Sequence, residues 1–269
     1  MTDALPAELR RARIVERVRE HGILRVAAAA AEFGVSEVTI RSDLAQLEAA
    51  GLIRRVHGSA LPMPGGPREE PLERVSTRDA AAKRAIGRRA AALVASGTSV
   101  LLDVGSTTLA VAHALVERVE RGELDELVVV TNGLSIALAL EPAVPRLTVV
   151  LTGGTLRPLQ HSLVDPGASE SLAGLHVDLA ILGCNGVDEE GRVTNLNLAE
   201  AQVKRAMLAA SASWLVAAES AKLGARHLGT IGTLGPDATL VTAGAWTDAA
   251  AACVASLTSL GACVVRADG

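Results

Sequence analysis

Residues 33–58 read FGVSEVTIRSDLAQLEAAGLIRRVHG, and this stretch decides the fold of the N-terminal part of the chain. Gly34 is expected to end an alanine-rich helix, and Ser36 can cap the next helix by accepting from its free N–H groups. Three apolar residues then repeat at the spacing that makes one face of a helix, Ile40, Leu44 and Leu47. The order of these features predicts the second half of a helix-turn-helix.

A basic hairpin follows the predicted helix, because Gly51 ends the helix and Leu52–Val56 reads as a short strand. In a helix-turn-helix, the first residues of the second helix reach base edges in the DNA major groove. Arg41 is the best candidate for such a contact, since its planar fork pairs with two acceptors at once. The full set of candidate DNA contacts is Ser36, Glu37, Thr39, Arg41, Ser42, Arg54, Arg55 and His57.

The alternative is an ordinary amphipathic helix whose arginine only solvates a face. The succession of two helices, a glycine turn, a capped helix and a basic hairpin favours the DNA-binding interpretation. Residues 7–62 accordingly form a predicted winged helix-turn-helix domain, with the motif itself at about 24–43 and helices at 9–21 and 25–33.

Composition limits the possible classes of protein. The chain has 269 residues, enough for two domains, and a net charge of −4, which argues against a uniformly basic nucleic-acid coat but not against a local footprint. No apolar run is long enough to span a membrane, and the N-terminus lacks a secretory pattern. Three cysteines without metal-ligand spacing indicate a reducing cytoplasm, with no metal and no cofactor.

The N-terminal part resembles the DNA-binding domain of the DeoR/GlpR family of bacterial transcription regulators. The family pattern V-S-x-x-T-I-R-R-D-L, followed by L-x-R-x-H-G-G-A, is matched at Val35–Leu44 and Ile53–Ala60 with two departures. Ser42 replaces the second arginine, and Ser59 replaces the second glycine of the wing. The resemblance implies a double-stranded operator as partner, and the loss of one arginine implies a different affinity or operator choice.

The segment LPMPGGPREEP at 61–71 is rich in proline and glycine, which predicts a linker at 63–75 and a second domain at 76–269. A long helix is expected at 77–96, with Lys83 and three arginines on its polar side. Beyond it, apolar strands alternate with helices, which predicts a doubly wound α/β sheet. The strands are expected at 99–104, 127–131, 147–152, 177–183, 213–219, 238–243 and 262–267. The helices are expected at 107–121, 134–140, 167–174, 198–211 and 247–259.

Ligands of such sheets bind beyond the carboxyl ends of the strands, so the loops there are the candidate site. Residues 103–108, Asp-Val-Gly-Ser-Thr-Thr, follow a strand and open a helix, which suits a phosphate, although a plain capped turn is an equal alternative. Other strand ends offer Thr131, Asn132, Gly153, Gly154 and Asn185. Lys204, Glu219 and Lys222 come from later segments, and Lys204 is equally well explained as a surface lysine.

This part resembles the DeoR-type sensor domain, which is related to sugar-phosphate isomerases and coenzyme A transferases. The matching motifs include D-x-G-S-T-T at 103–108, L-T-G-G-x-L-R-P at 151–158 and S-x-K-x-G at 220–224. The resemblance implies that an effector site, typically for a phosphorylated sugar, is lined by Asp103, Gly105, Ser106, Thr107, Thr108, Asn132, Gly153, Lys204 and Lys222. Glu219 stands where the family usually has aspartate, so the effector class is better defined than its identity.

The sequence therefore predicts a transcriptional regulator, most simply a repressor, whose operator binding is controlled by an anionic metabolite and which acts as a homo-oligomer, a dimer or tetramer. The alternative from another class is an active sugar-phosphate isomerase or deaminase that uses Asp103, Glu200 or Glu219 as an acid or base. Redox sensing through Cys184 is a minor third option, since a reactive thiol needs positive charge nearby.

Overall fold

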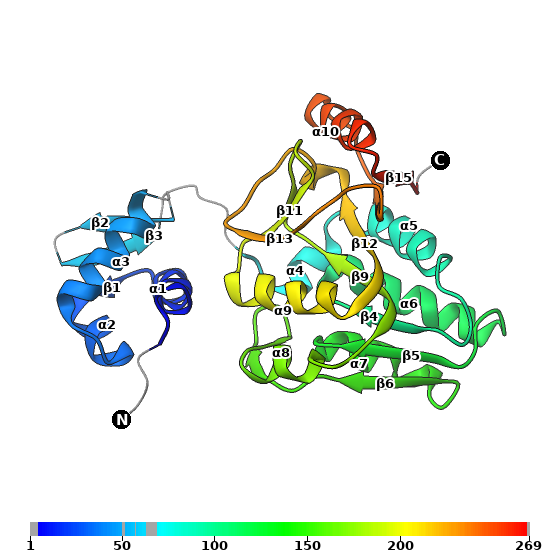
Figure 1. The fold of residues 1–269 in the computed structure, drawn as a ribbon, viewed down its shortest axis with the longest axis horizontal. Coiled ribbons are helices and arrows are strands. Elements are labelled where there is room, and N and C mark those ends of the chain that lie inside the picture. Colours follow the sequence, from blue (N-terminus) through cyan, green and yellow to red (C-terminus); the bar gives the residue numbers. More distant parts are fainter. Residues whose placement is uncertain (1–4, 50–51, 57, 63–68, 268–269) are drawn as a thin grey trace. The chain divides into compact units, whose positions relative to one another are not determined.

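The computed structural model describes residues 5–49, 52–56, 58–62 and 69–267. The chain divides into two compact units, Met1–Arg68 and Glu69–Gly269, each with its own hydrophobic core (Figure 1). Within the described residues, no helix is long and apolar enough to cross a membrane.

The N-terminal unit is a three-helix domain with a small antiparallel sheet of order β1-β3-β2. Its elements are α1 Ala7–His21, β1 Leu24–Arg25, α2 Val26–Phe33, α3 Glu37–Ala49, β2 Ile53–Val56 and β3 Ser59–Pro62. Ile14, Ile40 and Ile53, one from each of three elements, are fully buried in a single core. The predicted helices and hairpin are present, whereas β1 was not expected from the sequence. Gly51 and His57 lie outside the described residues.

The turn before α3 forms as the sequence predicts. Gly34 takes a left-handed conformation, φ 63°, and its N–H donates to the carbonyl of Ala30. The Ser36 hydroxyl accepts from the N–H of Thr39 at 3.1 Å and so satisfies one of the free donors at the start of α3. Two successive helices are thereby separated by a tight turn, as a helix-turn-helix requires.

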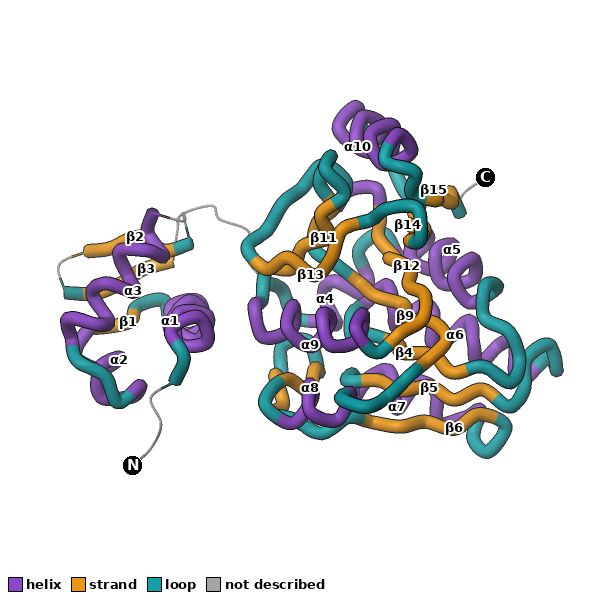
Figure 2. Tube along the Cα trace, in the orientation of Figure 1, coloured by secondary structure: helices purple, strands orange, loops and turns teal. Residues whose placement is uncertain are grey.

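The second unit is built on a seven-stranded parallel sheet of order β15-β14-β12-β9-β4-β5-β6 (Figure 2). Its strands are β4 Ser99–Leu102, β5 Leu127–Thr131, β6 Leu147–Leu151, β9 Val177–Gly183, β12 Ser211–Glu219, β14 Ala238–Ala243 and β15 Cys263–Arg266. Its helices are α4 Leu72–Thr77, α5 Ala80–Ala91, α6 Ser106–Glu120, α7 Leu134–Leu140, α8 Gly167–Leu172, α9 Leu198–Ala209 and α10 Asp248–Ser259, with short 3₁₀ turns η1 Glu141–Ala143 and η2 Ser220–Lys222.

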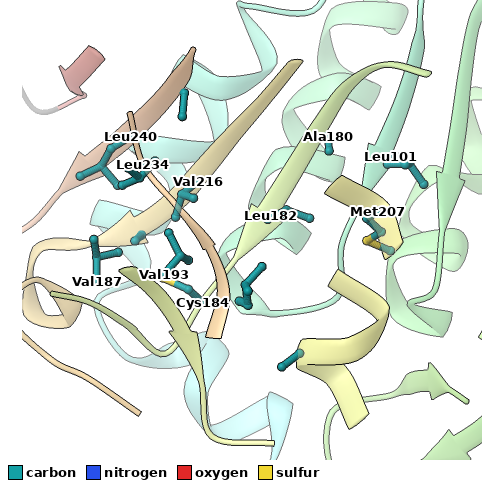
Figure 3. Packing of buried hydrophobic residues seen from close by; sticks show 14 of the residues in the cluster. Leu101, Ala180, Leu182, Cys184, Val187, Val193, Met207, Val216, Leu234 and Leu240 are labelled. Carbon is teal, nitrogen blue, oxygen red and sulfur yellow. The ribbon is translucent and has the colours of Figure 1, made fainter. Parts of the chain in front are cut away.

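Helices cover both faces of this sheet, which is the doubly wound arrangement. Successive strand residues point to opposite faces, so Leu102 packs with α5, α6 and α7 while Leu101 packs in the cluster that includes α8, α9 and α10. Figure 3 shows the cluster that contains Leu101, where Leu182 of β9 lies in the view between Val216 of β12 and Met207 of α9. The core is built from aliphatic residues, as expected of a chain with 1% aromatic residues.

The strand order reverses between β4 and β9, because the chain passes outward from β4 to β6 and then returns to add β9, β12, β14 and β15 on the other side. In a parallel sheet of this kind, the carboxyl ends of the two strands at the reversal diverge and leave room for a ligand. Asp103 directly follows β4, and Gly183 ends β9, so both lie at this point.

Two expectations differ from the structure. The long helix predicted at 77–96 is shorter, because α5 spans only Ala80–Ala91, and Asp79, whose φ is 48°, separates it from α4, which ends at Thr77. Lys83 was assigned to the polar side of that helix but is buried. Its ammonium group donates to the carbonyl of Arg78 and pairs with Glu219, and these contacts compensate for the loss of hydration. Helix α4 also begins inside the range predicted as linker.

Two small sheets were not predicted. β7 Thr155–Arg157 and β8 Ser162–Val164 form an antiparallel hairpin. The other sheet has the order β10-β11-β13, made of β10 Gly186–Val187, β11 Arg192–Asn195 and β13 Gly229–Thr233. Both sheets follow carboxyl ends of the main strands and add side chains to that edge.

Candidate functional site

Helix α3 presents one face to the core of its unit and the other to the surroundings. Ile40 and Leu44 are buried, while Arg41 and Ser42 are exposed. Val38 lies on the same outer face and is 72% exposed, which is unusual for a valine. The Arg41 guanidinium forms an ion pair with Glu37 one turn earlier, at 2.6 Å, and 55% of its side chain remains exposed. The exposed face therefore carries a forked cation, a hydroxyl and an apolar group.

The other predicted DNA contacts are placed as follows. The hydroxyls of Ser36 and Thr39 lie 2.9 Å apart and share a hydrogen bond, so they form a pair at the start of α3. Arg54 and Arg55 are exposed on β2, and the backbone N–H of Arg55 donates to Glu48. DNA contact by each of these residues stays a prediction, and His57 falls outside the described residues.

A buried ion pair that the sequence analysis missed holds α3 against α1. Arg10 Nε lies 2.6 Å from Asp43 Oδ2, and the side chains of both residues are less than a tenth exposed. Asp43 interrupts an otherwise apolar face, and a carboxylate on such a face is a signal for a buried cationic partner. The pair fixes the orientation of the helix that carries Arg41.

In the second unit, Asp103 and Lys204 form the centre of the candidate effector site. Lys204 Nζ lies 2.7 Å from Asp103 Oδ2 and donates to the carbonyl of Gly183 at 2.9 Å. The N–H of Gly183 donates to Asp103 Oδ2 as well, at 2.9 Å. The structure thus brings together the ends of β4 and β9 with α9, and the interpretation of Lys204 as a surface lysine is wrong.

Burial shifts the ionisation of this pair. Loss of hydration raises the pKa of Asp103 to about 6, although the nearby Lys204 opposes the shift. For Lys204, burial lowers the pKa, but the carboxylates of Asp103 and Glu200 outweigh burial and leave the pKa above its ordinary value. Lys204 is therefore a cation at neutral pH, and Asp103 is close to its titration range.

The start of α6 contributes backbone donors to the same edge. Gly105 precedes the helix with φ 138°, a conformation that favours glycine, and its carbonyl accepts from the Thr108 hydroxyl at 2.9 Å. The first N–H groups of a helix have no partner within the helix and carry partial positive charge. The segment Ser106–Thr108 therefore offers the geometry that binds a phosphate.

A second charged cluster lies at the end of β12. The Thr107 hydroxyl donates to Glu219 Oε1, which lies 3.6 Å from Lys222 Nζ, and Glu219 Oε2 lies 3.4 Å from Lys83 Nζ. Burial by itself would raise the pKa of Glu219, but Lys222, Thr107 and Lys83 together hold it below the ordinary value. Glu219 is accordingly a carboxylate shared by two lysines.

The buried polar atoms without a hydrogen-bond partner among the described residues include two carbonyl-type acceptors directly after β4 and β5, Asp103 Oδ1 and Asn132 Oδ1. The two residues are neighbours, because β4 pairs with β5 in a register that sets Leu102 beside Thr131. The Asn132 amide nitrogen donates to the carbonyl of Leu163 at 3.1 Å, which leaves the amide oxygen as the free acceptor. Buried acceptors without partners are rare in folded proteins and point to a donor supplied from outside the chain.

The remaining predicted effector residues make contacts within the protein. Thr131 accepts from the N–H of Gly133, and Asn185 accepts from the N–H of Leu196. The N–H of Gly153 donates to Ser171, and a Cβ added to Gly154 would lie 2.3 Å from the carbonyl of Val164. These contacts account for the residue types, and the effector role of these four residues stays a prediction.

A buried chain of charges next to Lys204 was not predicted, although Glu200, one of its members, was named as a possible acid or base. Arg157 bonds to Glu200 with one end of its guanidinium group and to Glu69 with the other, the latter at 2.6 Å. Glu200 also accepts from Ser162 at 2.7 Å. A signal was present in the sequence, because Glu200 and Lys204 are spaced to share one face of a helix.

Cys184 follows β9 and lies close enough to Lys222, Lys204, Glu219 and Asp103 for their charges to affect its thiol. Burial raises the pKa of Cys184 to about 11, and the effects of Lys222 and Lys204 are opposed by Glu219 and Asp103. The thiol is therefore neutral at physiological pH, which disfavours redox sensing.

The buried charges of the site balance. Among the described residues around the carboxyl edge, four cations lie beside four carboxylates. The cations are Lys83, Arg157, Lys204 and Lys222, and the carboxylates are Glu69, Asp103, Glu200 and Glu219. Each carboxylate has a cationic partner, so these eight groups together carry no net charge.

Each of the two units matches a known family of domains. Residues 10–62 match the DeoR-like helix-turn-helix domain, and residues 78–243 match the DeoR C-terminal sensor domain. A winged helix-turn-helix joined to an α/β domain with a polar edge defines a regulator that reads DNA and senses a ligand. The chain belongs to the DeoR family of transcriptional regulators.

Several curated relatives align over most of the chain. The HTH-type transcriptional regulator GlpR of Haloferax volcanii is 36% identical over 82% of this chain and 84% of its own length. The glycerol-3-phosphate regulon repressor of Escherichia coli strain K12 is 28% identical over 82% of this chain and 84% of its own. The transcriptional repressor AccR of Agrobacterium fabrum is 31% identical over 79% of this chain and 80% of its own.

Solved structures are similar at a lower level. The ribose 5-phosphate isomerase from Plasmodium falciparum aligns with a TM-score of 0.39 at 15% identity and covers 52% of each chain. The eIF2B delta subunit from Chaetomium thermophilum aligns with a TM-score of 0.39 at 14% identity, over 80% of this chain and 63% of its own. Likeness of this degree is too weak to carry a conclusion about activity.

Proposed function

We propose that the chain is a repressor that binds operator DNA through its N-terminal unit and leaves the operator when a phosphorylated sugar occupies the carboxyl edge of the parallel sheet. The family membership supports repression, because relatives matched over most of their length carry repressor names. As a DNA-binding regulator it would act in the cytoplasm.

Operator binding is proposed to use the exposed face of α3 and the β2–β3 hairpin. Arg41 would read a guanine or bind a phosphate, and Ser42 would contact the backbone or a base edge. Val38, which the sequence analysis overlooked, would pack against a thymine methyl group, because its side chain is exposed on the same face. Two such units on symmetric half-sites would require a homo-oligomer.

The class of effector follows from the chemistry of the edge. Free N–H groups at the start of α6, together with Lys222, suit an anion such as a phosphate. The partnerless acceptors Asp103 Oδ1 and Asn132 Oδ1 suit hydroxyl donors. This pair of buried acceptors beside a helix start is the observation that carries the proposal, because a phosphorylated polyol supplies both complements in one molecule.

We further propose that the chain is not an isomerase or deaminase. The candidate bases Glu200 and Glu219 are tied to cations, and the pKa of each carboxyl lies below its ordinary value despite the opposing effect of burial. A weakened base is poorly suited to abstract a proton from carbon. Asp103 has a raised pKa but is bonded to Lys204 through one oxygen.

The test combines two measurements on the full chain. Thermal stability is measured with a panel of sugar phosphates and their unphosphorylated parent sugars, and operator affinity is then measured with the compounds that stabilise the protein. Promoter DNA from beside the protein's own gene serves as the operator candidate. Stabilisation by phosphorylated compounds alone, followed by DNA release, is expected. Equal stabilisation by the parent sugars would contradict the phosphate assignment, and turnover of any compound would favour the enzyme.

A further inference from the structure

The β7–β8 hairpin is bonded on one side to the loop that follows β5. Asn132 and Leu163 exchange two hydrogen bonds, one from the Asn132 side chain at 3.1 Å and one from the Leu163 N–H to the Asn132 carbonyl at 2.8 Å. The N–H of Leu134 also donates to the carbonyl of His161 at 2.9 Å. A displacement of Asn132 is therefore transmitted directly to β8 and the turn before it.

On its other side, the same hairpin is bonded to residues 69–73, which open the second unit. The N–H of Leu72 donates to the carbonyl of Leu159 at 3.0 Å, and the side chain of Gln160 donates to the carbonyl of Glu70 at 2.6 Å. These are backbone-directed bonds, so they fix the position of the segment and not only that of its side chains.

Arg157 adds a charged connection between this segment and the interior of the site. Its guanidinium bonds Glu69 on one side and Glu200 on the other, and the side chains of Arg157 and Glu69 are 13% and 10% exposed. Glu200 is held in turn by Ser162 and by Asn195, whose amide nitrogen donates to it at 3.2 Å. Charges this well buried favour a few discrete arrangements over continuous sliding.

Glu200 also connects this chain of contacts to Lys204. The two residues lie one turn apart on α9, and the charge of Lys204 contributes to holding the pKa of Glu200 below its ordinary value, against the larger opposing effect of burial. Two routes of contacts therefore connect the partnerless acceptors to Arg157. Asp103 is connected through Lys204 and Glu200 of α9, because Lys204 bonds Asp103 Oδ2. Asn132 is connected through Leu163 of β8, which pairs with β7, the strand that ends at Arg157.

We infer that Arg157 is a positioning residue that carries the effector signal to the segment entering the second unit, because it is the point where both routes meet Glu69. This inference rests on the proposed function of the edge as an effector site. An O–H donor at the site, either a hydroxyl of the effector or the O–H of a hydrogenphosphate ion, engages Asn132 or Asp103 and shifts β8 and α9, and the shift moves Glu69 and the turn of chain attached to it. The DNA-binding unit is attached at that segment by the sequence itself.

A purely structural role for Arg157 makes a different prediction, so the two can be separated. If the Glu69–Arg157 ion pair only stabilised the fold, its loss would change the melting temperature and leave the response of residues 69–77 to ligand intact. The coupling role requires that loss of the Glu69–Arg157 ion pair, which leaves at most a neutral hydrogen bond, disconnect these residues from the site while the site still binds. Glu69→Gln is the suitable change, because it keeps Arg157 bonded to Glu200 and leaves no buried carboxylate unpaired.

The experiment is hydrogen–deuterium exchange on the full chain with and without inorganic phosphate, followed in peptides that cover residues 128–135 and 69–77. In the wild-type protein we expect phosphate to slow exchange by about threefold or more in both regions, since exchange reports local opening. In Glu69→Gln we expect the effect at 128–135 to persist and the effect at 69–77 to be lost. Glu70→Gln is the matched control, because Glu70 pairs with Arg74 and Arg78 of its own segment, and both effects should persist.

The other possible results contradict either the role of Arg157 or the phosphate site. A full response at 69–77 in Glu69→Gln, or a wild-type response confined to 128–135, would refute the role of Arg157 while leaving the effector site intact. Absence of any response to phosphate in the wild-type protein would refute the phosphate site and this inference with it. Melting curves verify folding, and Glu69→Asp, which shortens the side chain and withdraws the carboxylate, replaces Glu69→Gln if that variant is unfolded.

Discussion

Replacing Arg41 by alanine tests how α3 recognises DNA. The Arg41–Glu37 ion pair in the free protein is exposed and spans one helical turn, so it is worth about 0.3–0.5 kcal/mol. A bidentate contact between arginine and guanine is worth about 1–3 kcal/mol. Giving up the first to make the second leaves a net loss of about 0.5–2.7 kcal/mol in the variant, or roughly 2- to 100-fold in operator affinity for each half-site.

The assay is fluorescence anisotropy with a labelled operator fragment and, separately, a random duplex of the same length. A base contact predicts that Arg41→Ala weakens operator binding and hardly changes random binding, and that Arg41→Lys fails to restore it because the fork is lost. Arg17→Ala is the control, since Arg17 pairs with Glu32 elsewhere in the unit. An equal loss on both duplexes would show a phosphate contact instead, and no loss would refute any role of Arg41.

Three further changes test the rest of the structure. Asp43→Ala removes one partner of a buried ion pair with Arg10, so the free energy of unfolding in urea should fall by about 3–5 kcal/mol, and a loss below about 1 kcal/mol would show that the pair is not buried in solution. Lys222→Met should abolish operator release by the sugar phosphate that stabilises the wild type, without changing operator affinity; release at the wild-type concentration would exclude Lys222 as a ligand. Because the pKa of Asp103 is raised from 3.8 to about 6, the native state binds the extra proton, and stability from this group falls as pH rises from about 4 to 6. Asp103→Asn should remove that decline, worth roughly 2–3 kcal/mol in the difference between the two unfolding curves, and identical curves would contradict the raised pKa.

The alternation of apolar strands and helices was enough to predict the parallel sheet, because buried parallel strands need uninterrupted apolar runs. β5 and β9 have the bounds that their apolar runs predict. The pattern could not predict β7 or β8, since strands of three residues are too short to show a periodicity in the sequence. The break between α4 and α5 was missed because Arg78 and Asp79 are compatible with a helix, and only tertiary contacts such as that of Lys83 with Glu219 fix the interruption.

The sequence could predict those residues of the candidate site that directly follow a strand, since the carboxyl ends of parallel strands lie at one edge of the sheet. Asp103 and Asn132 are neighbours for this reason. Which groups are paired could not be predicted, because Lys204 with Asp103 and Arg157 with Glu69 join segments far apart in the sequence. Burial of Lys204 likewise depends on how α9 packs on the sheet, which a single sequence does not state.

The equal numbers of cations and carboxylates around the carboxyl edge have a consequence for how a metabolite finds the protein. With no local excess of positive charge, and a net charge of −4 on the whole chain, nothing attracts a phosphate over nanometre distances, so capture relies on short-range bonds formed after contact. Association should then proceed at ordinary diffusional rates, and sodium chloride should change metabolite affinity far less than it changes affinity for DNA. A regulator built in this way keeps its threshold for the metabolite nearly constant while the ionic composition of the cell varies.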